Sequence, residues 1–178
     1  DGSELKQLTF GDGEVQPAIS PDGQWVYYAT GGISGGHGER TLWRVASGGG
    51  EPQKLVDGIA HGADVSPDGK AFAAWYKPPD SGWKLAIFKA EGGPPLKMFD
   101  ADMGVPVKWT ADGKAVAYMK VVNGVSNIWK QPVDGGDPVK VTGYTTMRTL
   151  NFDWSADDRI VCVRNERTTN VVLVKNFR

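Results

Sequence analysis

Short, nearly continuous hydrophobic runs recur along this chain, each one directly after a polar turn. The runs are Trp25–Ala29, Ala71–Tyr76, Ala115–Met119 and Ile160–Val163. Apolar runs of this length bounded by turn residues are typical of strands that are buried on both faces. No segment shows a sustained apolar period of 3.6 residues, so the pattern predicts strands and no helix.

The polar turn that precedes each run has almost the same sequence every time. The four copies are Ser20–Gly23, Ser66–Gly69, Thr110–Gly113 and Ser155–Asp158, and their first residues are 46, 44 and 45 positions apart. Proline at the second position presets φ, aspartate can bond the backbone ahead of it, and glycine supplies positive φ. A turn repeated at this period indicates a repeat architecture.

A hairpin with a glycine-rich turn is the second repeated feature. In its clearest copy, Gly124–Thr142, two short strands flank the turn Asp134–Asp137. Earlier copies turn at Gly48–Gly50 and Gly92–Gly93. With a short strand before each polar turn, every repeat has four antiparallel strands, a to d, which is the signature of a propeller blade.

The sequence therefore predicts an all-β fold, a single β-propeller domain of about four blades over residues 1–178. The expected parts are residues 1–10, strand d of the closing blade; 11–56, blade 1; 57–99, blade 2; 100–142, blade 3; and 143–178, strands a to c of the closing blade. The N-terminal strand is expected to pair with a strand c at residues 170–174. That pairing would close the ring and remove two exposed strand edges.

The two faces of such a ring differ. The uniform a–b and c–d turns form one face, here called the turn face, and the b–c and d–a loops of variable length form the other, the loop face. Binding residues usually lie on variable loops held by a rigid scaffold. The candidate binding residues of the loop face are His37, Arg40, His61, Lys77, Trp83, Tyr144, Arg148, Arg164 and Arg167. The basic residues suit a phosphate or carboxylate, and the aromatic residues suit recognition of a partner.

Metal binding and catalysis have little support in the pattern. The two histidines, His37 and His61, lack ligand spacing, and their glycine-rich neighbours predict exposure to solvent. Serine recurs at the start of the polar turns, where it is expected to stabilise the turn, and no G-x-S-x-G motif is present. We predict no enzyme activity and no cofactor. Asp64, Lys108 and Asp153 are expected to make the central channel polar, with a bound cation as the alternative.

Net charge and composition limit the classes of partner that the chain is expected to bind. The formal net charge is −1, so no overall basic field attracts nucleic acid or an anionic membrane. No run approaches the roughly 20 apolar residues of a membrane-spanning helix, so direct membrane insertion is not expected. Cys162 is the single cysteine, which rules out an intrachain disulfide and suits an inert core thiol.

The polar turn followed by an apolar strand resembles the TolB-like, WD-type propeller repeat of bacterial proteins, over essentially the whole chain. The segments GVSNIWKQPVDGGDPVKVT, NFDWSADDR and TTNVVLVKNFR resemble the end of the propeller attached C-terminally to bacterial serine/threonine protein kinases. The departures are Ala111 and Ala156 for the turn proline and Asp158 for the turn glycine, and they leave the fold expectation unchanged. No kinase motif is present. The resemblance implies a sensory or interaction module, extracytoplasmic in a membrane kinase.

The functional expectation is a non-catalytic ligand- or protein-binding propeller that is part of a larger bacterial protein, such as a receptor-type kinase. Its partner would be a protein, a peptide or a cell-envelope ligand, and the chain would be a monomer or a homodimer. Two alternatives stay open. In the first, the chain is an accessory, gating propeller of a prolyl-oligopeptidase-like hydrolase. In the second, it is half of an eight-bladed ring that two chains form.

Overall fold

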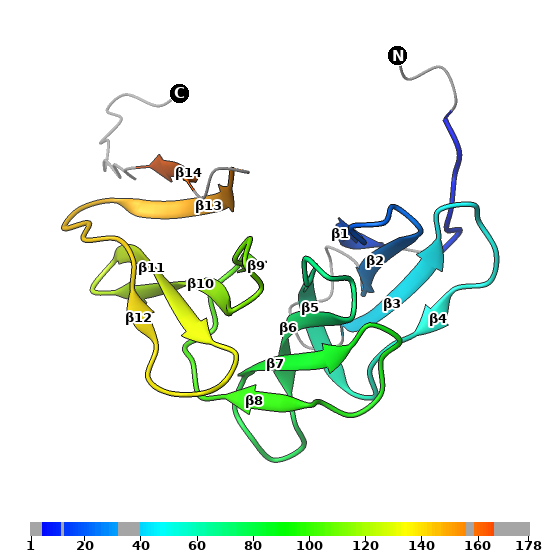
Figure 1. Ribbon diagram of the computed structural model, residues 1–178, viewed down its shortest axis with the longest axis horizontal. Coiled ribbons are helices and arrows are strands. Elements are labelled where there is room, and N and C mark those ends of the chain that lie inside the picture. The colour runs from blue at the N-terminus through cyan, green and yellow to red at the C-terminus, as the bar shows by residue number, and fades with distance from the viewer. Residues whose placement is uncertain (1–4, 12, 32–39, 156–158, 166–178) are drawn as a thin grey trace, which may run out of the picture.

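The computed structural model describes residues 5–11, 13–31, 40–155 and 159–165. These residues form antiparallel sheets and no helix, three sheets of four strands and one of two. The sheets follow one another along an arc, with strand a of each on the inside (Figure 1). The prediction of an all-β propeller of about four blades is confirmed. No described helix is long and apolar enough to cross a membrane.

Each blade is a meander of strands in chain order. Blade 1 contains β1 (Val15–Ile19), β2 (Trp25–Thr30), β3 (Thr41–Ala46) and β4 (Gln53–Lys54). Blade 2 contains β5 (Ile59–Val65), β6 (Ala71–Lys77), β7 (Lys84–Lys89) and β8 (Lys97–Phe99). Blade 3 contains β9 (Val107–Trp109), β10 (Ala115–Val122), β11 (Val125–Pro132) and β12 (Val139–Lys140). Blade 4 contains β13 (Arg148–Trp154) and β14 (Ile160–Asn165).

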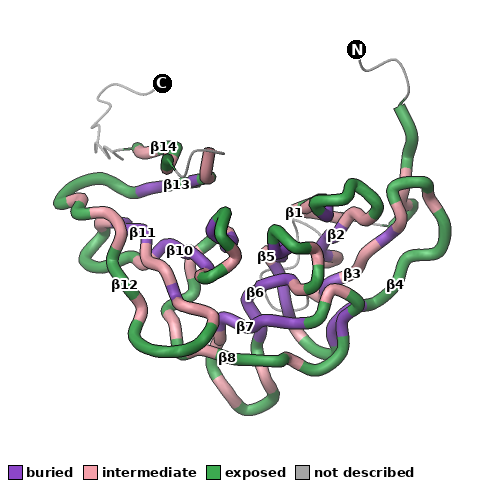
Figure 2. The backbone as a smooth tube through the Cα atoms, viewed as in Figure 1, coloured by how far each residue is buried: buried purple, intermediate pink, exposed green. Residues whose placement is uncertain are grey.

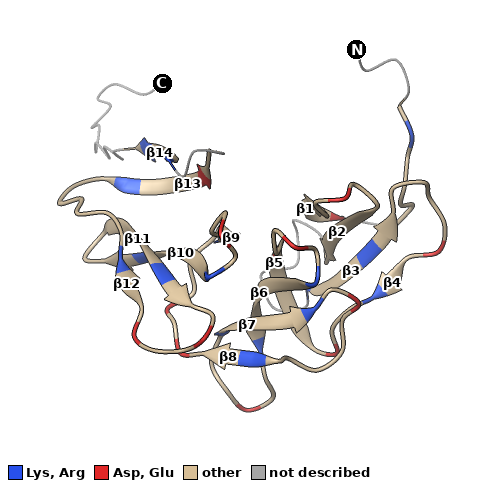
Figure 3. Cartoon of the chain, viewed as in Figure 1, with Lys and Arg blue, Asp and Glu red and all other residues tan. Residues whose placement is uncertain are grey.

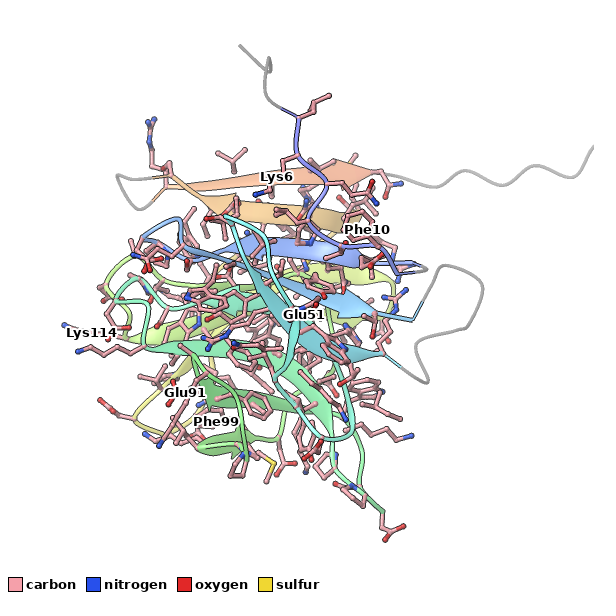
Figure 4. The ribbon with its side chains drawn as sticks, turned by 90° about the vertical axis from the view of Figure 1, so that its right-hand side faces the viewer. Lys6, Phe10, Glu51, Glu91, Phe99 and Lys114 are labelled. Carbon is pink, nitrogen blue, oxygen red and sulfur yellow. The ribbon has the colours of Figure 1, made fainter. Side chains whose placement is uncertain are left out.

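The polar turns have the predicted chemistry. In blade 2 the Ser66 hydroxyl donates to Asp68 Oδ1 at 2.6 Å, and the backbone N–H of Lys70 donates to the same oxygen at 3.1 Å. The turn glycine, Gly69, has a φ of 71°. The same hydrogen bonds occur in blades 1 and 3. Glu91 and Lys114, which belong to a c–d turn and an a–b turn, lie toward the same side of the molecule (Figure 4).

In blades 1 to 3, burial is concentrated in the middle strands, while the outermost strands β4, β8 and β12 are mostly exposed (Figure 2). Alternate residues of strand b face the following blade. The sheet registers make two sets equivalent: Tyr27, Ala73, Ala117 and Val161, and then Ala29, Trp75, Met119 and Val163. In blades 1 to 3 all of these residues are buried. Each blade is therefore held by an apolar junction with the next one.

Within the residues that the structure describes, the arc is open at its ends. In blade 4 the residues that face onward, Val161 and Val163, are 66% and 56% exposed. At the other end the described residues before β1 form no strand, and Phe10 is 83% exposed. Figure 4 shows Lys6 and Phe10 on this segment, which runs over the outside of the molecule. The partner strand expected at residues 170–174 lies outside the described residues, so ring closure stays a prediction.

Candidate binding face

A pocket of about 350 Å³ opens on the loop face between blades 3 and 4. Its apolar wall is formed by Met103, Val105, Met119, Val121 and Leu150. Its polar residues are His61, Ser126, Arg148 and Thr149. The wall therefore combines strand a of three blades or the loops next to it with both middle strands of blade 3. Two of the predicted candidates, His61 and Arg148, lie in this pocket.

The loop before β9 makes one side of the pocket, and Gly104 fixes its position. The indole N–H of Trp75 donates to the Gly104 carbonyl at 3.0 Å. A Cβ atom at Gly104 would lie 1.8 Å from the carbonyl oxygen of Met119, so only glycine allows this close approach of two backbones. The contact holds Met103 and Val105, the neighbours of Gly104, at the pocket wall.

The rim of the pocket is unusually apolar for a surface. Met103, Val105, Val121 and Leu150 are 39%, 36%, 44% and 52% exposed, although all four are large hydrophobic residues. Single exposed hydrophobic residues are ordinary, but a group around one concavity marks an interaction site. Sequence reasoning missed these residues because they come from different blades and follow no local motif.

Two buried hydroxyl groups belong to the same pocket. Ser126 is 1% exposed and Thr149 is 4% exposed, and neither hydroxyl has a hydrogen-bond partner among the described residues. Burying a hydroxyl without a partner costs roughly 1–3 kcal/mol, and most buried polar groups avoid this cost. The wall of the pocket therefore includes two buried hydroxyl groups to which no described residue is hydrogen-bonded.

His61 differs from its prediction. It lies in β5 rather than in a loop, and it is fully buried instead of exposed to solvent. A bulge between His61 and Asp64 shifts the register of β5, and Gly62 within it has a φ of 69°. The Trp83 ring packs edge-to-face on the imidazole, with 4.9 Å between the two ring centres. The other histidine, His37, lies outside the described residues.

Tyr144 and Arg164 form a stacked pair beside the pocket. The Arg164 guanidinium carbon lies 3.6 Å from the centre of the Tyr144 ring, and Arg164 is opposite Thr149 across β13 and β14. Asn127 holds the backbone of Tyr144 with two hydrogen bonds of 2.7 and 3.1 Å. The hydrogen bond with Cys162, and then burial, raise the pKa of Tyr144 above 10.0. Cys162 is half-buried, so it is less enclosed than a core thiol.

Basic groups gather at this end of blade 4. Figure 3 shows that the basic positions of β13 and β14 lie at the same end of the two strands. Arg148 is exposed and has no ion pair among the described residues, whereas Lys120 of β10 is paired with Asp102 at 2.7 Å. Arg148 is therefore available to an anionic group of a ligand. Arg167, also predicted for this face, lies outside the described residues.

Arg40 and Lys77 are not brought to the pocket. They lie at the junction of blades 1 and 2, where the Arg40 carbonyl accepts a hydrogen bond of 2.7 Å from Ala60 N–H. Lys77 is paired in the sheet with Ile59, next to Ala60, and is exposed. Of the seven described candidates, His61 and Arg148 therefore line the pocket between blades 3 and 4, and Tyr144 and Arg164 lie beside it.

The central channel is polar, as expected. Lys108 Nζ lies 3.7 Å from Asp64 Oδ1 and 3.1 Å from Asp153 Oδ2. Burial raises the pKa of Asp64 even though the Trp109 N–H and Lys108 oppose the shift. Within the described residues, no group of three or more His, Cys, Asp or Glu side chains is arranged to hold a metal ion. Lys108 of blade 3 thus links a carboxylate of blade 2 with one of blade 4.

Comparison with known proteins places this geometry among propellers. No family model matches the chain. An uncharacterized protein from Agrobacterium fabrum is 26% identical over 159 residues, which cover 85% of this chain and 50% of that protein. The solved structure of TolB from Acinetobacter baumannii has a TM-score of 0.77 at 19% identity, over 96% of this chain and 42% of that one.

A chain in a solved nidogen–laminin complex is also similar, with a TM-score of 0.65 at 16% identity, over 85% of this chain and 56% of that one. The chain spans about half the length of the relatives that it matches. At these identities the likeness concerns the fold. The described residues have the fold of the TolB-like β-propellers.

Proposed function

We propose that this chain is a non-catalytic binding module that holds a protein or peptide partner on its loop face, at the pocket between blades 3 and 4. The observation that carries the proposal is the group of exposed apolar residues around a cavity whose wall includes two hydroxyl groups without a partner among the described residues. An apolar anchor in a pocket with a few convergent polar groups is the usual core of a protein interface.

The residues of the pocket suggest how a partner would be held. An apolar side chain of the partner would replace water against Met103, Val105 and Leu150. The Ser126 and Thr149 hydroxyls would bond to its polar groups, and Arg148 would pair with a carboxylate. Arg148 lies at the edge, so it would contribute mainly to the rate of association and to its dependence on salt.

The comparisons support a binding role in part. Two propellers of this fold are TolB and the propeller of a nidogen–laminin complex, and the second is seen in contact with another protein. The resemblance of residues 124–178 to kinase-attached propellers supports a finer proposal, in which the module senses a ligand outside the cytoplasm for a receptor-type kinase. A kinase domain in the same gene would support this proposal, and a G-x-S-x-G segment would favour the accessory propeller of a hydrolase.

The test is selection from a library of random peptides displayed on phage, with the whole chain as bait. The blocked variant V121E/L150E places two charges on the exposed pocket rim without touching the core. The matched control is Val139→Glu, a residue of β12 that is 57% exposed and far from the pocket in the blade.

We expect the wild type and the control to bind the enriched peptides equally. The blocked variant should bind them at least roughly tenfold more weakly, because loss of an apolar anchor costs more than 1 kcal/mol. Arg148→Ala should reduce affinity several-fold at low salt and less at high salt. Peptides that bind the blocked variant as tightly as the wild type would contradict the proposal, as would a failure to enrich any peptide.

A further inference from the structure

The junctions between successive blades repeat one geometry but are filled differently on the turn face. Between blades 1 and 2, the Arg44 guanidinium lies 4.0 Å from the centre of the Trp25 ring. Arg44 and the Tyr27 hydroxyl both donate to the carbonyl of Ala90, at 3.0 and 2.9 Å. Three large side chains of blade 1 therefore close this side of the junction against the c–d turn of blade 2.

The equivalent positions in blade 2 are occupied by much smaller side chains. The sheet pairs Trp25–Ala46 and Tyr27–Arg44 of blade 1 correspond to Ala71–Lys89 and Ala73–Ile87 of blade 2. Alanine thus replaces both aromatic residues, and isoleucine replaces the arginine. The position of Ala90 is taken by Val133, since each donates its N–H to the residue before strand b of its own blade.

Trp109 makes up for only part of the side-chain volume that blade 2 lacks at these positions. It lies in β9 where blade 2 has Val65, and its indole N–H donates to the Asp64 carbonyl at 3.0 Å. Trp109 packs with Ala73 in the apolar junction, so it replaces the bulk of Tyr27. Lys97 replaces one hydrogen bond of Arg44, since its ammonium group donates to the Val133 carbonyl at 2.6 Å as Arg44 donates to Ala90. No described residue takes the place of the stacked rings and planes of Trp25 and Arg44 at Ala71 and Ile87.

A pocket of about 360 Å³ remains at that place. Ala71, Ile87 and Val133, the counterparts of Trp25, Arg44 and Ala90, all line it, together with Leu96 and Trp109. Leu96 is 54% exposed at its edge. The volume is within the range of roughly 300–1,000 Å³ that is usual for ligand pockets.

We propose that this pocket between blades 2 and 3 binds an aromatic side chain of a peptide partner. The side chain is a tryptophan, because the indole of Trp25 fills the equivalent place between blades 1 and 2. The neighbouring junction shows that the blade geometry accepts an indole at this position. The Trp109 ring and the aliphatic wall supply apolar and aromatic contacts. The site lies on the turn face, opposite the loop-face pocket, so it does not depend on the proposed function.

The test is a titration of the whole chain, labelled with nitrogen-15, with N-acetyl-L-tryptophanamide, followed by two-dimensional NMR. We expect saturable shifts at the backbone amides of Ala71, Lys97 and Gly113. The plugged variant A71W/I87R copies blade 1, and it should raise the dissociation constant at least tenfold. Ala71→Trp alone is the second variant, in case the buried arginine disturbs folding. The loop-face variant V121E/L150E should bind the probe like the wild type.

Absence of saturable shifts at these amides would overturn the proposal. Unchanged binding by a folded plugged variant would do the same, because it would place the probe elsewhere. Equal affinity for N-acetyl-L-leucinamide would also overturn it, since the pocket would then be an apolar groove without aromatic preference.

Discussion

One carboxylate in each polar turn of blades 1 to 3 stabilises the turn in the same way. Asp22, Asp68 and Asp112 each accept a hydrogen bond from the hydroxyl that starts the turn and one from the backbone N–H two residues ahead. These bonds, the hydroxyl first and the backbone second, hold the pKa of all three carboxyl groups below 3.8. The recurrence of these residues in the sequence was sufficient to predict their role.

These carboxylates predict how stability depends on pH. A carboxyl group with a pKa lower in the folded chain than in the unfolded chain adds stability above its unfolded pKa, and this stability is lost as pH falls through the folded pKa. The free energy of unfolding, measured with urea, should therefore fall as pH decreases below 3.8. In the variant D22N/D68N/D112N the fall should be smaller, because asparagine keeps an acceptor but takes up no proton. An equally steep fall in the variant would show that other groups cause it.

Residues that act across blades were beyond sequence reasoning. The sequence predicted Arg148, Tyr144 and Arg164 as loop-face residues, and the structure brings them to one end of blade 4. It gave no signal for Ser126 and Thr149, because burial of a hydroxyl depends on a junction between blades. The pocket joins residues from β5, the loop before β9, β10, β11 and β13, which lie in three different blades.

At the scale of strands and turns, the sequence was more informative because turn chemistry is local. Proline, aspartate and glycine fix the backbone within a few residues, and the apolar runs between them have the length of a strand. Blade 4 shows the limit of this reasoning. In blade 4 the N–H of Ser155 donates to the carbonyl of Arg159, four residues ahead. In blade 2 the N–H of Ser66 donates to the carbonyl of Ala71, five residues ahead, so the turn of blade 4 is one residue shorter. The side chains of β14 therefore face opposite directions from those expected by simple alignment.

The glycine turn of blade 3 gives a test at this scale. Gly135 and Gly136 have φ angles of 108° and 92°, which β-branched residues rarely adopt. Replacing both with valine should lower the free energy of unfolding by roughly 2 kcal/mol or more, because each forced conformation costs about 1–3 kcal/mol. The measurement is urea denaturation followed by circular dichroism. Asp137→Val, at the same turn, is the control and should change stability little. A neutral double variant would mean that the turn has another conformation in solution.

At the scale of the whole molecule, the outer face of blade 4 exposes hydrophobic residues of β14. Val161 and Ala117 occupy equivalent positions in successive blades, yet Val161 is 66% exposed and Ala117 is 0% exposed. The difference arises because blade 4 has no following blade against it in the described residues (Figure 1). Sequence patterns cannot report this, since both residues lie in hydrophobic runs of the same kind.

Paired substitutions test whether this end is open in solution. Val161→Lys should change the free energy of unfolding by no more than about 0.5 kcal/mol, as for other surface positions. Ala117→Lys should destabilise the chain by about 3 kcal/mol or more, because it buries a charge in a packed junction. Equal destabilisation by the two variants would mean that another blade covers β14, through closure of the ring or through a second copy of the chain.

The most direct test of the binding role is to locate a selected peptide on the molecule. A peptide from the library selection that has no aromatic residue should be titrated into the nitrogen-15-labelled chain. We predict that the shifted amides are those of Val121, Ser126 and Leu150 on the loop face, with Gly69 and Gly113 on the turn face unchanged. Shifts confined to the turn face, or spread evenly over the blades, would contradict the assignment of the pocket between blades 3 and 4 as the binding site.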